Sequence, residues 1–204
     1  MRGRPRKKKG SNKAAWFTLA LCAVIVLVVA DKQGYIPSGL VTGSKVPPTT
    51  ACDIDFEANS SILSVCFSPA GDCESIYIDF ITQTQTEIDC AFFSFTSDPI
   101  GNALAEQAEA GKIVSIILEE GQLSQYSEEG KLAGAGADVL IDQNSAYMHN
   151  KFCVLPDLGL VITGSYNPTN NAETRNNENI VVLKGEDVAA LYKAEFDTLW
   201  EKWD

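Results

Sequence analysis

Hydrophobic side chains occur along this chain in two alternating patterns. Short, nearly continuous apolar runs rich in β-branched residues are typical of buried strands. Strands are therefore predicted at 62–67, 87–95, 112–119, 138–142, 151–155, 160–164 and 179–184. The runs 151–155 and 160–164 are separated only by Pro156 to Gly159, a composition that favours a tight turn, so we expect a β-hairpin there.

The stretches between the strands carry apolar residues three or four positions apart, which is the helical period. In the Ala-rich stretch 98–111, Asp98 is a candidate N-cap, Pro99 lies in the first turn and Gly111 is the stop. Helices are predicted at 73–85, at 98–111, after residue 119 to about Gly134, and at 186–203. Strands that alternate with helices predict an α/β fold with a mixed, largely buried β-sheet flanked by helices.

The first 30 residues have a different pattern, a basic head followed by an apolar run. The 17 residues 14–30 carry no charge, and about 17 apolar residues is the lower limit for a bilayer-spanning helix. One interpretation is a transmembrane anchor with the head 1–13 in the cytoplasm. The other is a cleaved secretory signal, because Val28 and Ala30 are small enough for a cleavage site. The length of the run favours the anchor, and both interpretations export the rest of the chain.

Charged residues are also distributed differently on the two sides of the apolar segment. Seven of the 16 Lys and Arg residues lie within 1–13, whereas all 27 Asp and Glu residues follow residue 30. Beside an apolar segment, such a head is expected to set membrane topology rather than to bind nucleic acid. Residues 31–60 are rich in Gly, Pro, Ser and Thr and are predicted to form a flexible linker, which leaves 61–204 as the folded domain.

Five of the six cysteines follow the apolar run. Cys66 and Cys73 bracket "FSPAGD", a turn-rich loop that a disulfide can close in an oxidising compartment. Cys90 and Cys153 lie in apolar strands and are expected to be buried thiols. No C-x-x-C pair occurs and the chain has one histidine, so no metal site is expected.

That histidine, His149, stands two positions before Lys151. Residues i and i+2 of a strand share a face, so the imidazole and the ammonium are expected side by side. An imidazole can attack phosphorus or transfer a proton while a fixed cation neutralises the phosphoryl oxygens. A lone histidine in an apolar run is more often structural, and the residues that follow change this interpretation.

Four further polar residues follow in the sequence. Ser165 and Asn167 come at the end of the hairpin, where a hydroxyl and an amide can hold the same phosphate, or can simply cap a turn. Glu178 begins the last strand, where its carboxylate can fix the tautomer of an imidazole or can face solvent. Arg175 either binds phosphate or lies in a loop.

The series "HNK", "GSYN" and "NEN" resembles the phospholipase D superfamily, whose motif reads H-x-K-x4-D followed by G-S-x-N. The upstream segment "VCFSPAGDCESIYIDFI" resembles the small, single-motif branch, which includes bacterial phosphodiesterase nucleases and a membrane-anchored mitochondrial relative. The resemblance covers about 62–203 and implies a phospholipase D-like fold. In one departure, Pro156 occupies the place of the motif aspartate, and Asp157 is either that residue shifted by one position or a turn residue.

The resemblance implies a two-step displacement at phosphorus without metal or cofactor. One histidine forms a phosphohistidine, and a second protonates the leaving oxygen and then activates water. The implied catalytic residues are His149, Lys151, Asp157, Ser165, Asn167 and Glu178. Because the chain has one histidine and no repeated motif, the second imidazole must come from another copy, which predicts a homodimer with a composite site.

The sequence allows two substrate classes, nucleic acid and phospholipid. Beyond residue 13 the chain has nine basic against 27 acidic residues, which works against tight polyanion binding, and an anchor would place the domain beside lipid head groups. The upstream resemblance favours an endonuclease acting on DNA or RNA, ahead of phospholipase D-type lipid hydrolysis. A membrane-anchored binding protein without turnover is the third alternative, although such a relative would be expected to lack His149 or Lys151.

Overall fold

The computed structural model describes residues 60–203 of the chain. The basic head predicted at 1–13, the apolar segment at 14–30 and all but the last residue of the predicted linker lie outside the described residues. Within 60–203, every helix is too short or too polar to cross a bilayer.

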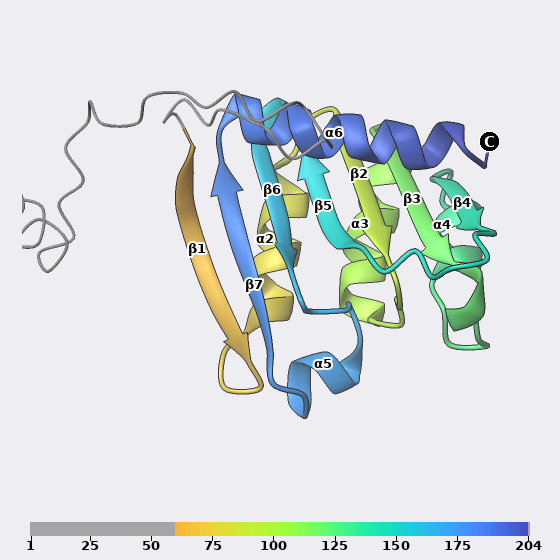
Figure 1. Ribbon diagram of the computed structural model, residues 1–204, viewed down its shortest axis with the longest axis horizontal. Coiled ribbons are helices and arrows are strands. Elements are labelled where there is room, and N and C mark those ends of the chain that lie inside the picture. Colours follow the sequence, from red (N-terminus) through yellow and green to blue (C-terminus); the bar gives the residue numbers. More distant parts are fainter. Residues whose placement is uncertain (1–59, 204) are drawn as a thin grey trace, which may run out of the picture. The chain divides into compact units, whose positions relative to one another are not determined.

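A seven-stranded sheet forms the centre of this domain, in the order β1-β7-β6-β5-β2-β3-β4 (Figure 1). The neighbours β2, β3 and β4 run parallel, and the other neighbouring pairs are antiparallel. The strands are β1 (Ser61–Ser68), β2 (Glu87–Phe92), β3 (Ile113–Glu119), β4 (Asp138–Asp142), β5 (Lys151–Leu155), β6 (Leu160–Gly164) and β7 (Glu178–Lys184). The predicted mixed sheet is confirmed.

Helices cover both faces of the sheet. Helices α2 (Cys73–Gln83) and α3 (Asp98–Glu109) lie behind the sheet in Figure 1, whereas α6 (Glu186–Glu201) crosses its front. The larger apolar cluster lies on the side of α2 and α3, and smaller clusters form beneath α6 around Phe152 and Val161. Each large apolar side chain buried in this way contributes about 1.5–3 kcal/mol.

Local sequence explains where α2 and α3 begin. Asp72 accepts a hydrogen bond from Ser75 N and caps α2, which buries Cys73, Tyr77 and Ile81 at a spacing of four residues. Ser97, rather than the predicted Asp98, caps α3 by accepting from Ile100 N. Asp98 lies one position later because Ser97 is the last residue with extended backbone.

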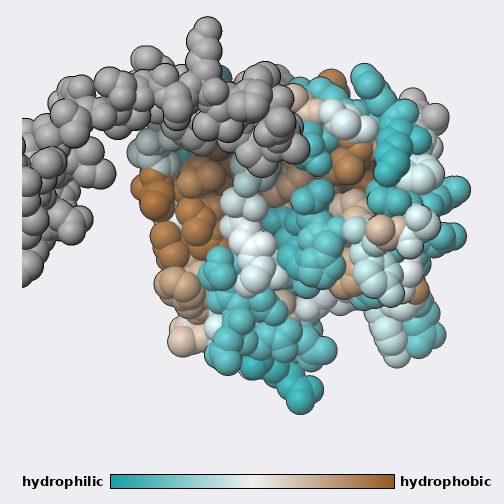
Figure 2. Space-filling model, in the orientation of Figure 1, coloured by the Kyte–Doolittle hydropathy of each residue, from teal (hydrophilic) through white to brown (hydrophobic). Residues whose placement is uncertain are grey.

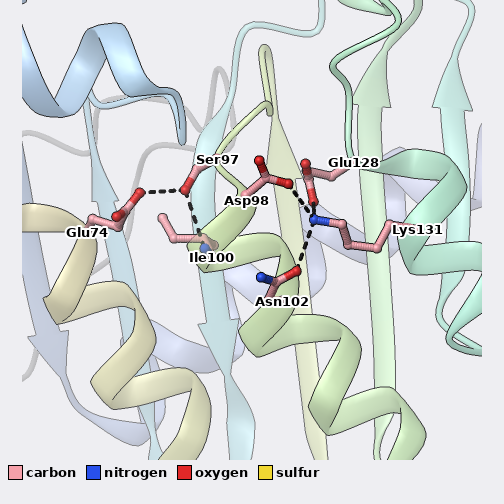
Figure 3. Close-up of polar contacts among 7 residues, drawn as sticks. All are labelled: Glu74, Ser97, Asp98, Ile100, Asn102, Glu128 and Lys131. Atoms are coloured by element: carbon pink, nitrogen blue, oxygen red, sulfur yellow. Dashed lines mark hydrogen bonds and ion pairs between the residues drawn. The ribbon is translucent and has the colours of Figure 1, made fainter.

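Side chains tie α3 to both neighbouring helices (Figure 3). The Ser97 hydroxyl donates to Glu74 of α2 over 2.6 Å. On the other side, Lys131 of α4 (Glu129–Gly134) lies 2.8 Å from Asp98 and 2.7 Å from the buried Glu128. Because Gly101 has no side chain, Glu128 can lie directly against α3. These contacts link the three helices on this side of the sheet.

Two regions differ from the predicted helices. The stretch after residue 119 is not one polar helix: a 3-10 turn, Glu120–Gln122, is followed by a loop and by the short α4. In that loop the Ser124 and Ser127 hydroxyls accept backbone N–H bonds, which compete with helix formation. The other difference is α5 (Asn170–Thr174), capped by Thr169, which is too short to show a periodic pattern.

Two disulfides are present in the described domain. Cys66 of β1 pairs with Cys73 at the start of α2, with an S–S distance of 2.04 Å, and closes the turn-rich loop. Cys90 and Cys153 are fully buried but form a second disulfide, so the expectation of thiols is wrong. The reason lies in the sheet: β2 and β5 are antiparallel neighbours, and Cys90 lies directly opposite Cys153. This pairing links strands that are 63 residues apart.

Candidate active site

The candidate site lies at one edge of the sheet, where β2, β6 and the segment before β5 meet. Lys151 is the first residue of β5, and His149 precedes it. The loop after β2 and the loop after β6 are joined there, because Thr96 N and Ser97 N donate to Pro168 O over 2.8 and 3.0 Å. Backbone contacts therefore hold together segments that are far apart in the sequence.

Lys151 and His149 lie side by side. Lys151 Nζ is 3.1 Å from His149 Nδ1 and donates to His149 O over 2.8 Å. The lysine is 8% exposed and its ammonium lies 4.9 Å from the centre of the Phe93 ring. Burial lowers the pKa of Lys151, and the carboxylate of Glu178 offsets part of this effect. The pair thus combines an exposed imidazole with a largely buried cation.

Two contacts fix the backbone on either side of His149. Glu119, buried at the end of β3, accepts from Met148 N over 2.8 Å and from Gly121 N over 3.2 Å. Asn150 O accepts from Phe93 N over 2.9 Å, and the Phe93 ring lies 4.3 Å from the imidazole, centre to centre. The sequence pattern does not identify Glu119, because its only signal is an acidic residue that ends a buried strand.

Ser165 and Glu178 form a second polar group at this edge. The Ser165 hydroxyl donates to Glu178 over 2.6 Å and accepts from Asn179 N over 3.1 Å. Asn176 donates to the other carboxylate oxygen of Glu178 over 3.2 Å. Within the described residues, Glu178 contacts Ser165 and Asn176 rather than the imidazole of the same chain. Its charge nevertheless acts on Lys151.

Asn167 connects the loop after β6 to the loop after β2. Its Oδ1 accepts from Ser94 N over 3.2 Å, one residue from Phe93. The structure therefore brings His149, Lys151, Ser165, Asn167 and Glu178 to the same edge of the sheet, on β5, β6 and β7 or directly beside them.

Asp157 lies apart from this group, and within residues 60–203 no side-chain hydrogen bond or ion pair joins Arg175 to it. Asp157 is in the 3-10 turn Pro156–Leu158, at the far end of β5, where it accepts from Gln85 N over 2.7 Å. It is a turn residue, because the hairpin places it a full strand length from His149. Arg175 follows α5 and is exposed, and its backbone N–H donates to Asn171 O.

The arrangement defines a class of site. A nucleophilic or proton-transferring imidazole beside a fixed cation, with hydroxyl and amide donors nearby, is suited to a phosphoryl group. Among residues 60–203, no three His, Cys, Asp or Glu side chains are grouped as metal ligands. Residues 77–200 match the family model described as cardiolipin synthase, PLD-like domain. The chain therefore belongs to the phospholipase D superfamily.

Two relatives illustrate this membership. The chain is 34% identical over 128 residues to a mitochondrial cardiolipin hydrolase from Chlamydomonas reinhardtii, a match that covers 62% of this chain and 57% of the relative. It is 30% identical over 191 residues to a phospholipase D from Rickettsia bellii, covering 90% and 94% of the two chains. The chain thus spans little more than half of the algal relative but nearly all of the rickettsial one.

The fold is likewise similar to that of solved structures. Nuc from Salmonella typhimurium, described as a phospholipase D family member, superposes with a TM-score of 0.66 and 28% sequence identity. The superposition covers 71% of this chain and 97% of Nuc. The described domain is therefore a nearly complete counterpart of a small phospholipase D-family domain.

Proposed function

We propose that this chain is a metal-independent phosphodiesterase in which His149 is the nucleophile and Lys151 the fixed cation. The observation that carries the proposal is the 3.1 Å separation between Lys151 Nζ and His149 Nδ1. A largely buried ammonium is a strong partner for phosphate oxygens because little water screens its charge. The exposed imidazole is accessible for attack on phosphorus, and Asn167 can donate to the remaining oxygens, as can Ser165 once its hydroxyl turns from Glu178.

The proposed reaction has two steps. A ring nitrogen of His149 attacks phosphorus, a P–N bond forms, and the P–O bond to the leaving alcohol breaks as a second imidazolium protonates that oxygen. The second imidazole, now neutral, then takes a proton from water while the water oxygen attacks phosphorus and the P–N bond breaks. A phosphomonoester is released and both imidazoles return to their initial states. Glu178 would orient one of the imidazoles.

A homodimer would supply the second imidazole. The chain has one histidine, so the acid of the first step must be His149 of a second copy. An apolar surface suited to such contact lies on the edge strand β1, where Ile62, Leu63, Val65 and Phe67 are 47–67% exposed. Figure 2 shows this apolar area over β1 and β7.

The apolar surface continues to the candidate site. Phe67 is opposite Asn179 in the sheet, and Asn179 N donates to the Ser165 hydroxyl. A second copy docked along this surface would therefore lie beside the residues that are proposed to bind phosphate. An exposed apolar strand of this kind is otherwise an aggregation hazard, which favours its burial in a specific interface.

Nucleic acid is the substrate that we place first, with endonucleolytic cleavage of DNA or RNA as the reaction. The support is the resemblance to the branch of bacterial phosphodiesterase nucleases and the hydrophilic surroundings of the site. Figure 2 shows a hydrophilic surface over α5 and the ends of the strands beside it. Phospholipid is second, supported by relatives named mitochondrial cardiolipin hydrolase and phospholipase D and by the apolar segment 14–30.

A paired assay tests the proposal. The full-length chain is incubated with single-stranded DNA or RNA and, separately, with phosphatidylcholine vesicles that contain cardiolipin, both with EDTA. We expect the chain to cleave the oligonucleotide equally well with and without EDTA. A phosphorylated histidine should be detected when the reaction is quenched without acid. His149→Asn should abolish both, whereas Asp157→Asn, at the far end of β5, is the matched control. Loss of activity with EDTA, or turnover by the His149→Asn variant, would contradict the mechanism.

We further propose that residues 14–30 anchor the chain in a membrane, with the domain on the extracytoplasmic side, or are removed as a signal. The support is the uncharged run of 17 residues behind a head with seven basic residues. Carbonate extraction of membranes from cells that express the tagged chain should leave it in the pellet. Full recovery of a shortened chain in the medium would instead establish cleavage.

A further inference from the structure

A cleft of about 380 Å³ opens between the loop after β2 and the loop after β6, and Phe93, which packs on His149, lines it. Two of its wall residues belong to the surroundings of the site. Phe93 packs against the imidazole at 4.3 Å, and Asn167 is bonded to Ser94 N. A substituent on a phosphate held at His149 can therefore extend into the cleft.

The walls of the cleft are polar but uncharged. Four asparagines, one glutamine, two threonines, one serine and Phe93 line it. An acyl chain requires apolar walls, and a choline or ethanolamine cation requires carboxylates or several aromatic rings. The lining instead matches a neutral group that both donates and accepts hydrogen bonds.

Several of the lining groups have free hydrogen-bonding capacity. Asn171 is exposed on α5, and its side-chain amide has no hydrogen-bond partner within residues 60–203. Gln122 makes only a long bond of 3.4 Å, to Gly121 O. Asn167 uses its oxygen for Ser94 N, so its two N–H groups are available. These groups can bind a ligand without breaking strong contacts in the domain.

We infer that this cleft binds the nucleobase of the nucleotide next to the scissile phosphate, an inference that rests on the proposed nuclease function. Asparagine and glutamine amides match the donor and acceptor edges of bases, and single-stranded bases are free to enter such a pocket. The excess of acidic residues in the chain also favours contacts to the base. With nine basic against 27 acidic residues after residue 13, phosphate contacts alone provide little affinity, so contacts to the base must supply more of it.

The test compares two single-stranded oligomers that have the same sugar–phosphate backbone, one with bases and one with abasic residues throughout. We expect the full-length chain to cleave the base-bearing oligomer about tenfold faster in kcat/KM, the size of one good amide–base contact. Asn171→Ala and, independently, Gln122→Ala should slow only the base-bearing oligomer. Gln83→Ala, an exposed glutamine at the end of α2, is the matched control. Cleavage of the abasic oligomer shows that each variant is folded.

The outcomes separate this inference from the proposed function. If neither oligomer is cleaved, the nuclease function itself is wrong and the inference fails with it. If wild type cleaves both oligomers equally, or if both variants slow the two oligomers alike, only the cleft assignment is overturned. The inference would also be overturned if the two variants slowed only the hydrolysis of cardiolipin-containing vesicles, because the cleft would then be a site for a lipid head group.

Discussion

Lys151 combines two properties that a phosphate-binding cation needs. Its side chain is largely buried, and its ammonium is held by both the backbone oxygen and the ring of His149. Burial lowers the pKa of Lys151, but the nearby Glu178 carboxylate favours the charged form and limits this effect. The side chains of Lys151 and His149 are therefore positioned together, and their position depends on the backbone around residue 149.

Glu119 is predicted to be a positioning residue for that backbone. Its carboxylate accepts from Met148 N, and without it the segment before β5 loses the buried contact that places His149. Glu119→Ala is expected to lower kcat by about 10- to 100-fold, because small displacements of catalytic groups are costly. Glu119→Gln, which keeps one acceptor oxygen, should recover part of the loss. Equal kcat in wild type and Glu119→Ala, measured on an oligonucleotide, would contradict this role.

Asp157 is predicted to matter for the turn rather than for the reaction. Its carboxylate accepts from Gln85 N in the connection between α2 and β2. Asp157→Ala should leave kcat/KM within about twofold of wild type and lower the free energy of unfolding by about 1 kcal/mol, the typical contribution of one hydrogen bond. Urea unfolding and the oligonucleotide assay measure the two quantities. A large loss of activity in a stable variant would restore Asp157 to the site.

At the scale of elements, α6 is held on the sheet by a charged contact as well as by apolar packing. Lys193 of α6 lies 3.4 Å from Asp89 and 3.5 Å from Glu87, both on β2. Asp89 is 1% exposed. Burial and the charge of Glu87 raise the pKa of Asp89 to about 7, although Lys193 and Ser115 act in the opposite direction. The docking of α6 therefore includes a carboxyl group that titrates near neutral pH.

This pKa predicts how stability depends on pH. The folded state binds a proton at Asp89 below about pH 7, whereas an unfolded aspartate binds one only below about pH 4. Stability from this group is therefore lost as pH rises through 7. From pH 5 to pH 8 the free energy of unfolding should fall by about 1–3 kcal/mol more in wild type than in Asp89→Asn. Urea unfolding at the two pH values measures it.

Asp197→Asn is the matched control for that experiment. It removes another carboxylate that lies 2.5 Å from Lys193 but leaves the buried Asp89 in place. Its pH dependence is expected to follow that of wild type. Parallel pH profiles in wild type and Asp89→Asn would instead show that Asp89 does not titrate in this range.

At the scale of the whole molecule, the proposed activity depends on assembly. One chain carries one imidazole, and the reaction needs two, so dimer formation and catalysis should be lost together. Val65 is 47% exposed in the centre of β1 and lies opposite Val181 of β7. Its side chain is within the apolar surface that we propose as the interface.

Val65→Asp is predicted to produce a monomer that lacks activity. A carboxylate in an apolar interface is costly unless it is paired, so association should weaken strongly. Light scattering measures the mass and the oligonucleotide assay measures turnover. Tyr126→Asp, at a residue that is 70% exposed in the loop before α4, is the matched control and should remain dimeric and active. An active Val65→Asp monomer would contradict the composite site.

The local pattern alone determined most of the elements and the group of polar residues. Strand and helix periods depend on neighbouring residues, so all seven strands of the described domain were predicted within a few positions. The spacing of His149 and Lys151, and the hairpin that follows, places Ser165 and Asn167 close by, because adjacent antiparallel strands must return to the same edge. The apolar segment 14–30 is likewise a property of the sequence alone.

Only the tertiary structure decided the contacts between distant segments. Cys153 meets Cys90, and Glu119 meets Met148, because the sheet order places β5 between β6 and β2, with β3 on the other side of β2. A periodic pattern indicates which face of a strand is buried, but not which strand lies next to it. That choice comes from packing the whole chain around one sheet.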